Sequence, residues 1–179
     1  VQTCALPISE LRWVSDDWLS RGNRKERQFG LGYFTDEYMS QASVAVLKNK
    51  ESEIVAFANI IPSPNPSISS IDLMRYKETS DSGLMHYLLL NLIAHQKEKG
   101  AQWFNLGFVP LAKDSLVQKE RMQENLLLTL RLFANRYFAF SGLERFKNTF
   151  DPEWSDRYLI YPNKKLSKTL VALDKLMSL

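Results

Sequence analysis

The segment "ISSIDLMRY", residues 68–76, combines the apolar residues of a buried strand with an acid and a base, Asp72 and Arg75. Charged side chains are rarely buried unless they are paired or functional. Because the two lie three positions apart, a regular strand would point them to opposite faces of its sheet. They can act together only if a bulge or the end of the strand lies between them. The segment alone therefore leaves two interpretations open, a strand-end ion pair and a functional site.

The neighbouring segments predict the sheet to which this strand belongs. Two β-branched, apolar runs at 43–49 and 53–61 are separated by a polar turn, which predicts an antiparallel hairpin. Apolar residues recur at helical spacing through 83–100, and the apolar run at 101–111 predicts another strand. Because a helix connects that strand to 68–76, the two should run parallel. The sequence thus predicts an α/β fold with a mixed sheet.

The remaining elements are predicted from shorter patterns. A helix should open at 15–22 with Ser15 as its N-cap, and a short helix should lie within 30–41. Beyond residue 111 we expect a long helix at 124–138, strands at 138–143 and 157–162, and a terminal helix at 165–179.

Composition places the chain among globular proteins. Its 179 residues are 45% hydrophobic and 24% charged, which is enough to bury the core of one domain. No apolar stretch approaches the length of a membrane span. The formal charge of +3 is concentrated at 21–27 and 131–168. Such clusters indicate a solvated face or a polyanionic partner, such as RNA or an anionic membrane.

The first nine residues resemble no domain start. "VQTCALPI" is too short and too polar for a signal peptide, and it back-translates into a widely used sequencing-adapter strand. We therefore predict that residues 1–9 are not native and that 10–179 form a single domain. Cys4 is the only cysteine, so without it thiol catalysis and a structural zinc site are excluded. The source DNA tests this hypothesis, because different codons upstream would refute it.

Several other residues carry possible chemistry. Asn105 and Gly107, near the end of a strand, fit either a backbone turn or a polar contact to substrate. Lys147 lies between two aromatic residues, where it either extends from the edge of the core or reaches a phosphate. His86 and His95 are nine positions apart on one helix, so they make no metal pair.

The sequence also argues against some enzyme classes. It holds no nucleophile elbow and no Walker-type loop. An acyl-coenzyme A transferase would need a glycine-rich cradle for pyrophosphate after residue 76, where only Gly83 is available.

Eight segments, taken together, resemble one family in order and spacing. The match runs from about residue 10 to residue 165, and the segments read "SDDWL", "FGLGYFTDEY", "VAVL", "IVAFANIIP", "SIDLMRY", "FNLGFVPL", "FSGLERFKNTFDPEW" and "RYLIYP". The family is the bacterial phosphatidylglycerol lysyltransferases, or multiple peptide resistance factors, in their C-terminal cytosolic domain. The resemblance implies a GNAT-like acyltransferase fold, as the second of two tandem acetyltransferase-like halves that follow a membrane region.

The resemblance also implies an activity. Such an enzyme transfers an aminoacyl group, typically lysyl, from aminoacyl-tRNA to phosphatidylglycerol at the cytoplasmic face of the membrane. It uses no cofactor besides the tRNA donor, and the cationic lipid it makes repels antimicrobial peptides. Its partners would be aminoacyl-tRNA, phosphatidylglycerol, and the membrane and first acetyltransferase-like regions of the full-length protein. Which amino acid is transferred stays open.

The family motifs fall on particular residues here. The "DLMR" motif implies catalytic Asp72 and Arg75, and the "GLxxFKxKF" pattern implies Lys147. We assign substrate binding to three further residues, Asn105, Gly107 and Arg145. The sequence departs from the family pattern at four positions, His86, Ala134, Asn135 and Thr149. Thr149 stands where a second basic residue is expected, which removes a charge from the predicted phosphate site.

Two alternative functions remain open at this point. The same fold and donor would serve an enzyme that aminoacylates a cell-wall precursor. A non-catalytic half that only docks tRNA or an anionic membrane would also account for the basic clusters.

Overall fold

The computed structural model describes residues 7–21, 26, 32–78, 83–109, 140–157, 160, 168, 169, 171, 172 and 175. The chain divides into two units. The first comprises Val1–Gly107 with Ser167–Leu179, and the second comprises Phe108–Leu166. The sheet and most of the described helices belong to the first unit, and helix α5 (Phe140–Asn148) belongs to the second.

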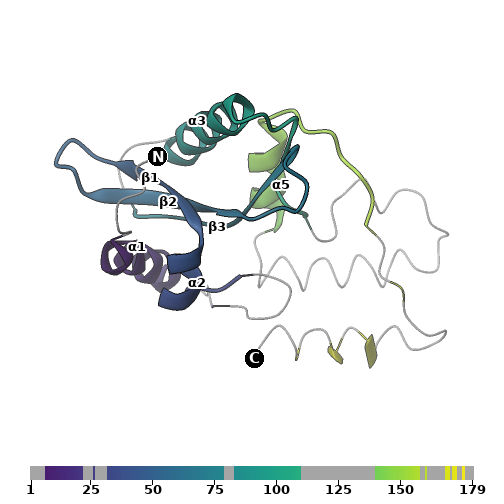
Figure 1. Cartoon of the computed structure of the whole chain (residues 1–179). Helices are drawn as coiled ribbons and strands as arrows, with labels where there is room; N and C mark the ends of the chain where they lie inside the picture. Colours follow the sequence, from purple (N-terminus) through teal and green to yellow (C-terminus); the bar gives the residue numbers. More distant parts are fainter. Residues whose placement is uncertain are drawn as a thin grey trace. The chain divides into compact units, whose positions relative to one another are not determined.

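The sheet of the first unit has the strand order β1-β2-β3-β4 (Figure 1). Its strands are β1 (Ser43–Lys48), β2 (Ile54–Ile61), β3 (Ile68–Tyr76) and β4 (Trp103–Asn105). The first three pair antiparallel, as the predicted hairpin requires, and β3 and β4 pair parallel with Ile68 opposite Trp103. Helix α3 (Leu84–Glu98) makes the connection between the parallel strands. The predicted mixed α/β sheet is therefore confirmed.

Helices cover both faces of this sheet. Figure 1 shows α1 (Ile8–Ser20) and α2 (Asp36–Gln41) on one side and α3 on the other. The apolar side chains of α3 recur every three or four residues, and those that face the sheet are buried. On the opposite side the core cluster consists of Leu11, Val14, Phe34, Met39, Val44, Ile54, Phe57 and Leu73. This cluster fixes α1 and α2 against the strands that carry the polar residues discussed below.

Two predicted elements are wrong. Ser15 is no N-cap, because α1 begins at Ile8 and Ser15 lies buried inside it. The apolar spacing of Leu11 and Val14 already belongs to this helix, so the acids after Ser15 did not mark its start. The strand predicted at 138–143 is also wrong where it is described, because Phe140–Asn148 is helical. The aromatic residues in this run suggested a strand, but their spacing is that of a helix.

Other predictions are only partly described. The strand predicted at 101–111 is three residues long, because a turn follows Asn105 at once. The helix at 124–138 lies outside the described residues, as do most of 157–162. Within the predicted terminal helix, the described residues Lys168, Thr169, Val171, Ala172 and Lys175 are helical.

Candidate functional site

A β-bulge interrupts strand β3 between Asp72 and Arg75. Ile71 pairs with Ile60 and Met74 pairs with Ala58, so Asp72 and Leu73 together face the single residue Asn59 of β2. The extra residue reverses the alternation of side chains along the strand. Arg75, opposite Phe57, and Asp72, opposite Asn59, consequently lie on the same face, which α1 and α2 cover. The sequence predicted that Asp72 and Arg75 could act on the same side of the sheet only with such a bulge between them.

The Asp72 carboxylate has two hydrogen-bond donors. The backbone N–H of Gly32 donates to Oδ1 at 3.1 Å, and the Tyr38 hydroxyl donates to Oδ2 at 2.6 Å. Tyr38 in turn accepts a hydrogen bond from the Asn59 side-chain amide at 3.1 Å. Burial, followed by the hydrogen bond to Asp72, raises the pKa of Tyr38 above its usual 10.0. The carboxylate is thus fixed on two sides by the protein.

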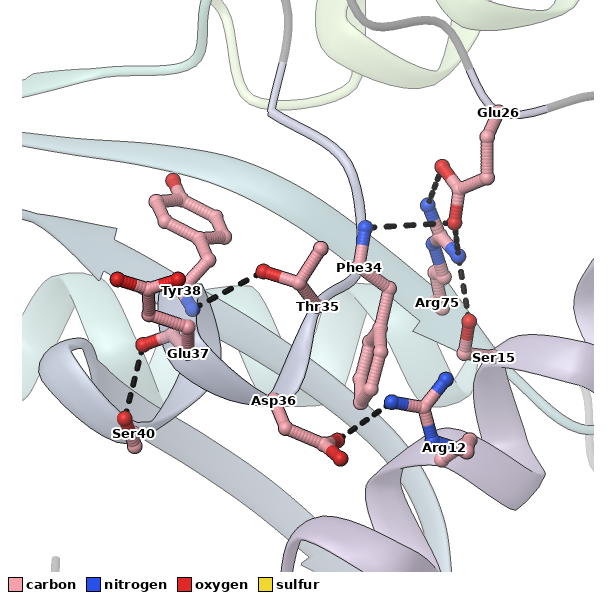
Figure 2. Close-up of polar contacts among 10 residues, drawn as sticks. All are labelled: Arg12, Ser15, Glu26, Phe34, Thr35, Asp36, Glu37, Tyr38, Ser40 and Arg75. Atoms are coloured by element: carbon pink, nitrogen blue, oxygen red, sulfur yellow. Dashed lines mark hydrogen bonds and ion pairs between the residues drawn. The ribbon is translucent and has the colours of Figure 1, made fainter.

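The position of Tyr38 follows from the start of α2. Thr35 is the N-cap, and its hydroxyl accepts a hydrogen bond from the backbone N–H of Tyr38 at 3.1 Å (Figure 2). Two acids, Asp36 and Glu37, occupy the first turn, where the helix dipole favours negative charge. The "TDEY" sequence therefore places the Tyr38 side chain one turn into the helix and against the sheet.

An open cleft lies in front of Asp72. Its volume is about 630 Å³, and it is lined by Gly32, Tyr33, Thr35, Glu37, Tyr38, Gln41, Ile61 and Asp72. Two carboxylates and two tyrosines in this lining make it suited to a cationic group rather than a phosphate. None of the described residues that line it is basic.

Arg75 has different surroundings from Asp72. Its side chain is buried, and both terminal nitrogens bind the Glu26 carboxylate at 2.7 Å (Figure 2). It also donates to the Ser15 hydroxyl of α1 at 2.5 Å and stacks over the Trp18 ring at 5.3 Å. Glu26 accepts a further hydrogen bond from the backbone N–H of Phe34 at 3.3 Å. Arg75 therefore links α1, β3 and the segment that leads into α2.

Asn105 and Gly107 form the turn that ends β4. The Asn105 side chain accepts a hydrogen bond from the Gly107 N–H at 2.8 Å, and Gly107 has a φ of 77°. A side-chain amide that replaces a backbone acceptor in this way is typical of Asn in turns. The turn interpretation of these two residues is confirmed, and a contact to substrate stays a prediction.

Lys147 lies on α5 in the second unit. It is buried, and its ammonium donates to the backbone oxygen of Phe108 at 3.2 Å. Burial lowers the pKa of Lys147 from 10.5 to about 8. Arg145, on the same helix, is exposed. Lys147 and Arg145 thus belong to one unit and Asp72 and Arg75 to the other, and their meeting in one cleft stays a prediction.

Sequence reasoning missed four residues of this region: Gly32, Tyr38, Asn59 and Glu26. Asn59 carried a detectable signal in the sequence, because it is a polar residue inside the otherwise apolar strand "IVAFANII". The structure shows that it is fully buried, where a polar side chain needs hydrogen-bond partners. Glu26 carried none, because it lies within a basic run. Its pairing with Arg75 depends on tertiary structure alone.

Within the described ranges, no three His, Cys, Asp or Glu side chains gather as a possible metal site. The same residues include no helix that combines the length and apolarity needed to cross a membrane.

The strand order, the crossover helix and the acidic cleft define an α/β protein with a candidate site at the bulge of β3. Comparison with known sequences gives its family. Residues 2–161 match the family described as "Phosphatidylglycerol lysyltransferase, C-terminal", and the chain belongs to it. The predicted resemblance is therefore confirmed.

Curated relatives agree with this assignment. The phosphatidylglycerol lysyltransferase of Bacillus subtilis is 37% identical over 171 residues, and that of Staphylococcus aureus strain MSSA476 is 34% identical over 170 residues. Each alignment covers 95% of this chain but 20% of the relative. The chain thus spans about a fifth of the length of the curated relatives that it matches.

Two solved structures share the fold. L-PGS from Bacillus licheniformis is 37% identical with a TM-score of 0.81, over 99% of this chain and 54% of that one. The C-terminal DUF2156 domain of a proposed lysylphosphatidylglycerol synthetase from Agrobacterium fabrum is 32% identical with a TM-score of 0.77, over 96% and 50%. The predicted α/β class with a mixed sheet is confirmed by the strand order, and both structures share the fold. Its GNAT-like acyltransferase type stays a prediction. The boundary at residue 9 and the single domain 10–179 stay predictions.

Proposed function

We propose that this chain is part of an aminoacyltransferase that esterifies phosphatidylglycerol with an aminoacyl group, lysyl, taken from aminoacyl-tRNA. The family match over residues 2–161 supports the reaction class. The observation that carries the proposal to a site is the Asp72 carboxylate, which lies at a bulge and faces an open, acidic cleft. Because the chain spans a fifth of its relatives, the longer protein would perform the reaction.

The reaction is a transesterification. The free hydroxyl oxygen of the lipid glycerol attacks the carbonyl carbon of the aminoacyl ester and forms a new C–O bond. The bond from that carbon to the tRNA terminal ribose breaks, and the hydroxyl proton ends on the ribose oxygen. Catalysis therefore needs a placed hydroxyl, a proton acceptor and positive charge near the phosphates and the developing oxyanion.

Asp72 meets the first two needs. Two donors fix its carboxylate, so its remaining lone pairs are available to a group in the cleft. We assign to it the orientation of the lipid hydroxyl or of the aminoacyl ammonium, with proton acceptance as a further role. Glu37 in the same lining adds a second negative charge. An acidic, aromatic cleft of this kind favours a cationic aminoacyl group.

Positive charge would come from Lys147 and Arg145, and from Arg75 only if Glu26 leaves it. With a pKa of about 8, Lys147 is still mostly protonated at neutral pH, so it can bind a phosphate of the lipid or of the tRNA terminus. Arg145 is exposed on the same helix and suits a bidentate contact. Arg75 already binds Glu26, so a direct phosphate contact would require Glu26 to leave. Asn105 and Gly107 would add polar contacts near the carbonyl.

The proposal also includes the substrates and the cellular location. Aminoacyl-tRNA and phosphatidylglycerol are the substrates, and the chain works at the cytoplasmic face of the membrane. The membrane region and first acetyltransferase-like region of the longer protein would complete the site.

The test is an assay of a full-length protein that carries this chain, supplied with radiolabelled lysyl-tRNA and vesicles containing phosphatidylglycerol. The expected result is label in a lipid extract. Parallel reactions replace phosphatidylglycerol with phosphatidylethanolamine vesicles or with a cell-wall precursor. Label in the precursor instead would overturn the lipid acceptor and favour the cell-wall enzyme.

A non-catalytic docking role is the second candidate. The specific observation in its favour is that Arg75 is occupied by Glu26, Ser15 and Trp18, together with Thr149 in place of a basic residue. Binding of tRNA or anionic vesicles that weakens with salt, without label transfer to any acceptor, would establish this role.

A further inference from the structure

The inference concerns the side chain of Asn59, which is fully buried in strand β2 opposite the bulge. Its Oδ1 accepts a hydrogen bond from the backbone N–H of Leu73 at 2.7 Å. This bond identifies which end of the amide is the oxygen. The Nδ2 end, which can only donate, bonds the Tyr38 hydroxyl oxygen at 3.1 Å.

The direction of the next hydrogen bond follows from this one. Because Tyr38 accepts from Asn59, its own proton is free to be donated, and the Asp72 Oδ2 atom at 2.6 Å receives it. The chain of donors therefore runs from Leu73 through Asn59 and Tyr38 to Asp72. An O–H donor to a carboxylate makes a short, strong hydrogen bond.

The space around the carboxylate is equally restricted. Gly32 approaches Asp72 so closely that a Cβ atom on Gly32 would lie 1.7 Å from Oδ2 and 3.2 Å from the Tyr38 ring. Asp72 is consequently held by a backbone N–H on one oxygen and by Tyr38 on the other. Among the described residues, the other titratable groups that line the cleft are Glu37 and Tyr33, and Arg75 on the same strand is bound by Glu26.

We propose that Tyr38 and Asn59 are positioning residues of the transfer reaction, which act through Asp72 by fixing its carboxylate in the orientation that faces the cleft. The inference rests on the proposed function, since it concerns the same site. Neither residue needs to touch substrate. Tyr38 acts directly on Asp72, and Asn59 acts one hydrogen bond further away by fixing the Tyr38 hydroxyl.

The bulge explains why an asparagine is needed. Two residues of β3 face one residue of β2, so the backbone N–H of Leu73 has no regular partner in the ladder. Asn59 supplies that partner from its side chain and keeps a second donor for Tyr38. One residue therefore satisfies the distorted backbone and orients the site.

The experiment measures kcat and KM for lipid aminoacylation by a full-length protein that carries this chain, with Tyr38→Phe and Asn59→Leu. Loss of one hydrogen bond to a charged group should lower kcat about tenfold in Tyr38→Phe, with KM for both substrates within about twofold. Asn59→Leu should lower kcat by about threefold, because it acts through Tyr38. Unfolding curves of each variant show that the folded state persists.

Tyr87→Phe is the matched control, since Tyr87 is exposed on α3, on the other side of the sheet. It should leave kcat unchanged. In an Asp72→Asn background, Tyr38→Phe should have no further effect on residual activity, as expected for a residue that acts through Asp72.

The failures can be told apart. An active parent whose Tyr38→Phe variant keeps the parent kcat overturns the inference alone, as does an equal loss in Tyr87→Phe. A parent protein that forms no aminoacylated product overturns the proposed function and the inference together.

Discussion

Asp72 and Arg75 lie on one strand and face the same side of the sheet, yet their surroundings are opposite. Asp72 is half-buried at an open cleft, with both oxygens bonded to uncharged donors. Arg75 is only 3% exposed, and a carboxylate, a hydroxyl and an indole ring surround it. Among the described residues no cation pairs with Asp72, and such a carboxylate at a cleft is poised to bind a cation, whereas a buried, paired guanidinium organises the fold. We therefore propose that one motif serves both chemistry, through Asp72, and the framework, through Arg75.

The largest expected effect concerns the framework. Arg75→Ala leaves Glu26 without its cationic partner, and we expect the free energy of unfolding to fall by about 3 kcal/mol. Arg12→Ala is the control, because its ion pair with Asp36 is exposed, with side chains 45% and 64% accessible. That substitution should cost less than about 1 kcal/mol. Urea unfolding measures both, and equal losses would contradict the assignment of Arg75 to the framework.

Lys147 gives a stability effect that depends on pH. Its pKa is about 8 when folded and 10.5 in the unfolded chain, so between these values the unfolded state holds a proton that the folded state has released. The free energy of unfolding should therefore rise with pH across this window, by up to about 3 kcal/mol.

Lys147→Met should remove this rise, and Lys48→Met, at an exposed position of β1, should keep it. Unfolding in urea at several pH values from 7 to 10.5 measures the difference between each variant and the parent. Parallel pH dependence in the parent and in Lys147→Met would show that burial does not shift this lysine.

Gly32→Ala should lower the rate of lipid aminoacylation, because it displaces Asp72. Its new Cβ atom would displace the carboxylate, and a misplacement of about 1 Å at a reacting group costs about hundredfold in rate. Gly142→Ala on α5 is the control, because a Cβ atom there meets nothing within 4 Å. The rate of lipid aminoacylation should be unchanged in that variant. A fully active Gly32→Ala protein would separate Asp72 from the reaction.

The smallest expected effect tests whether Asn105 only forms the turn after β4 or also contacts substrate. Asn105→Asp keeps an acceptor for the Gly107 N–H, so the turn and the stability should persist. It removes the two side-chain donors, so a contact to substrate would be lost and the transfer rate should fall about threefold to tenfold. An unchanged rate would leave Asn105 as a turn residue only.

The mixed sheet was predictable because its signals are local. The hairpin, the crossover helix and strand 68–76 each follow from periodicity and turn residues in one stretch of chain. The position of Ser15 inside a helix was not predictable, because that helix starts seven residues earlier. The role of Ser15 is set by Arg75, sixty positions away in the sequence.

The candidate site also has a part that was predictable from the sequence and a part that was not. Asp72 and Arg75 stood out as charges in an apolar strand, and the condition that a bulge must separate them could be stated in advance. Their different partners could not, because Glu26 and Tyr38 approach from distant segments. The register shift at Asn59 likewise depends on how two strands pair.

The most direct test of the central claim, that Asp72 serves chemistry and Arg75 the framework, is the rate of phosphatidylglycerol aminoacylation by an Asp72→Asn variant of a full-length protein that carries this chain. Asn keeps the size of the side chain: its oxygen can still accept from the Gly32 N–H, and its amide can donate to the Tyr38 oxygen, so the free energy of unfolding should change by less than about 1 kcal/mol. The account predicts a loss of rate of at least about hundredfold. A folded variant with the parent rate would contradict it.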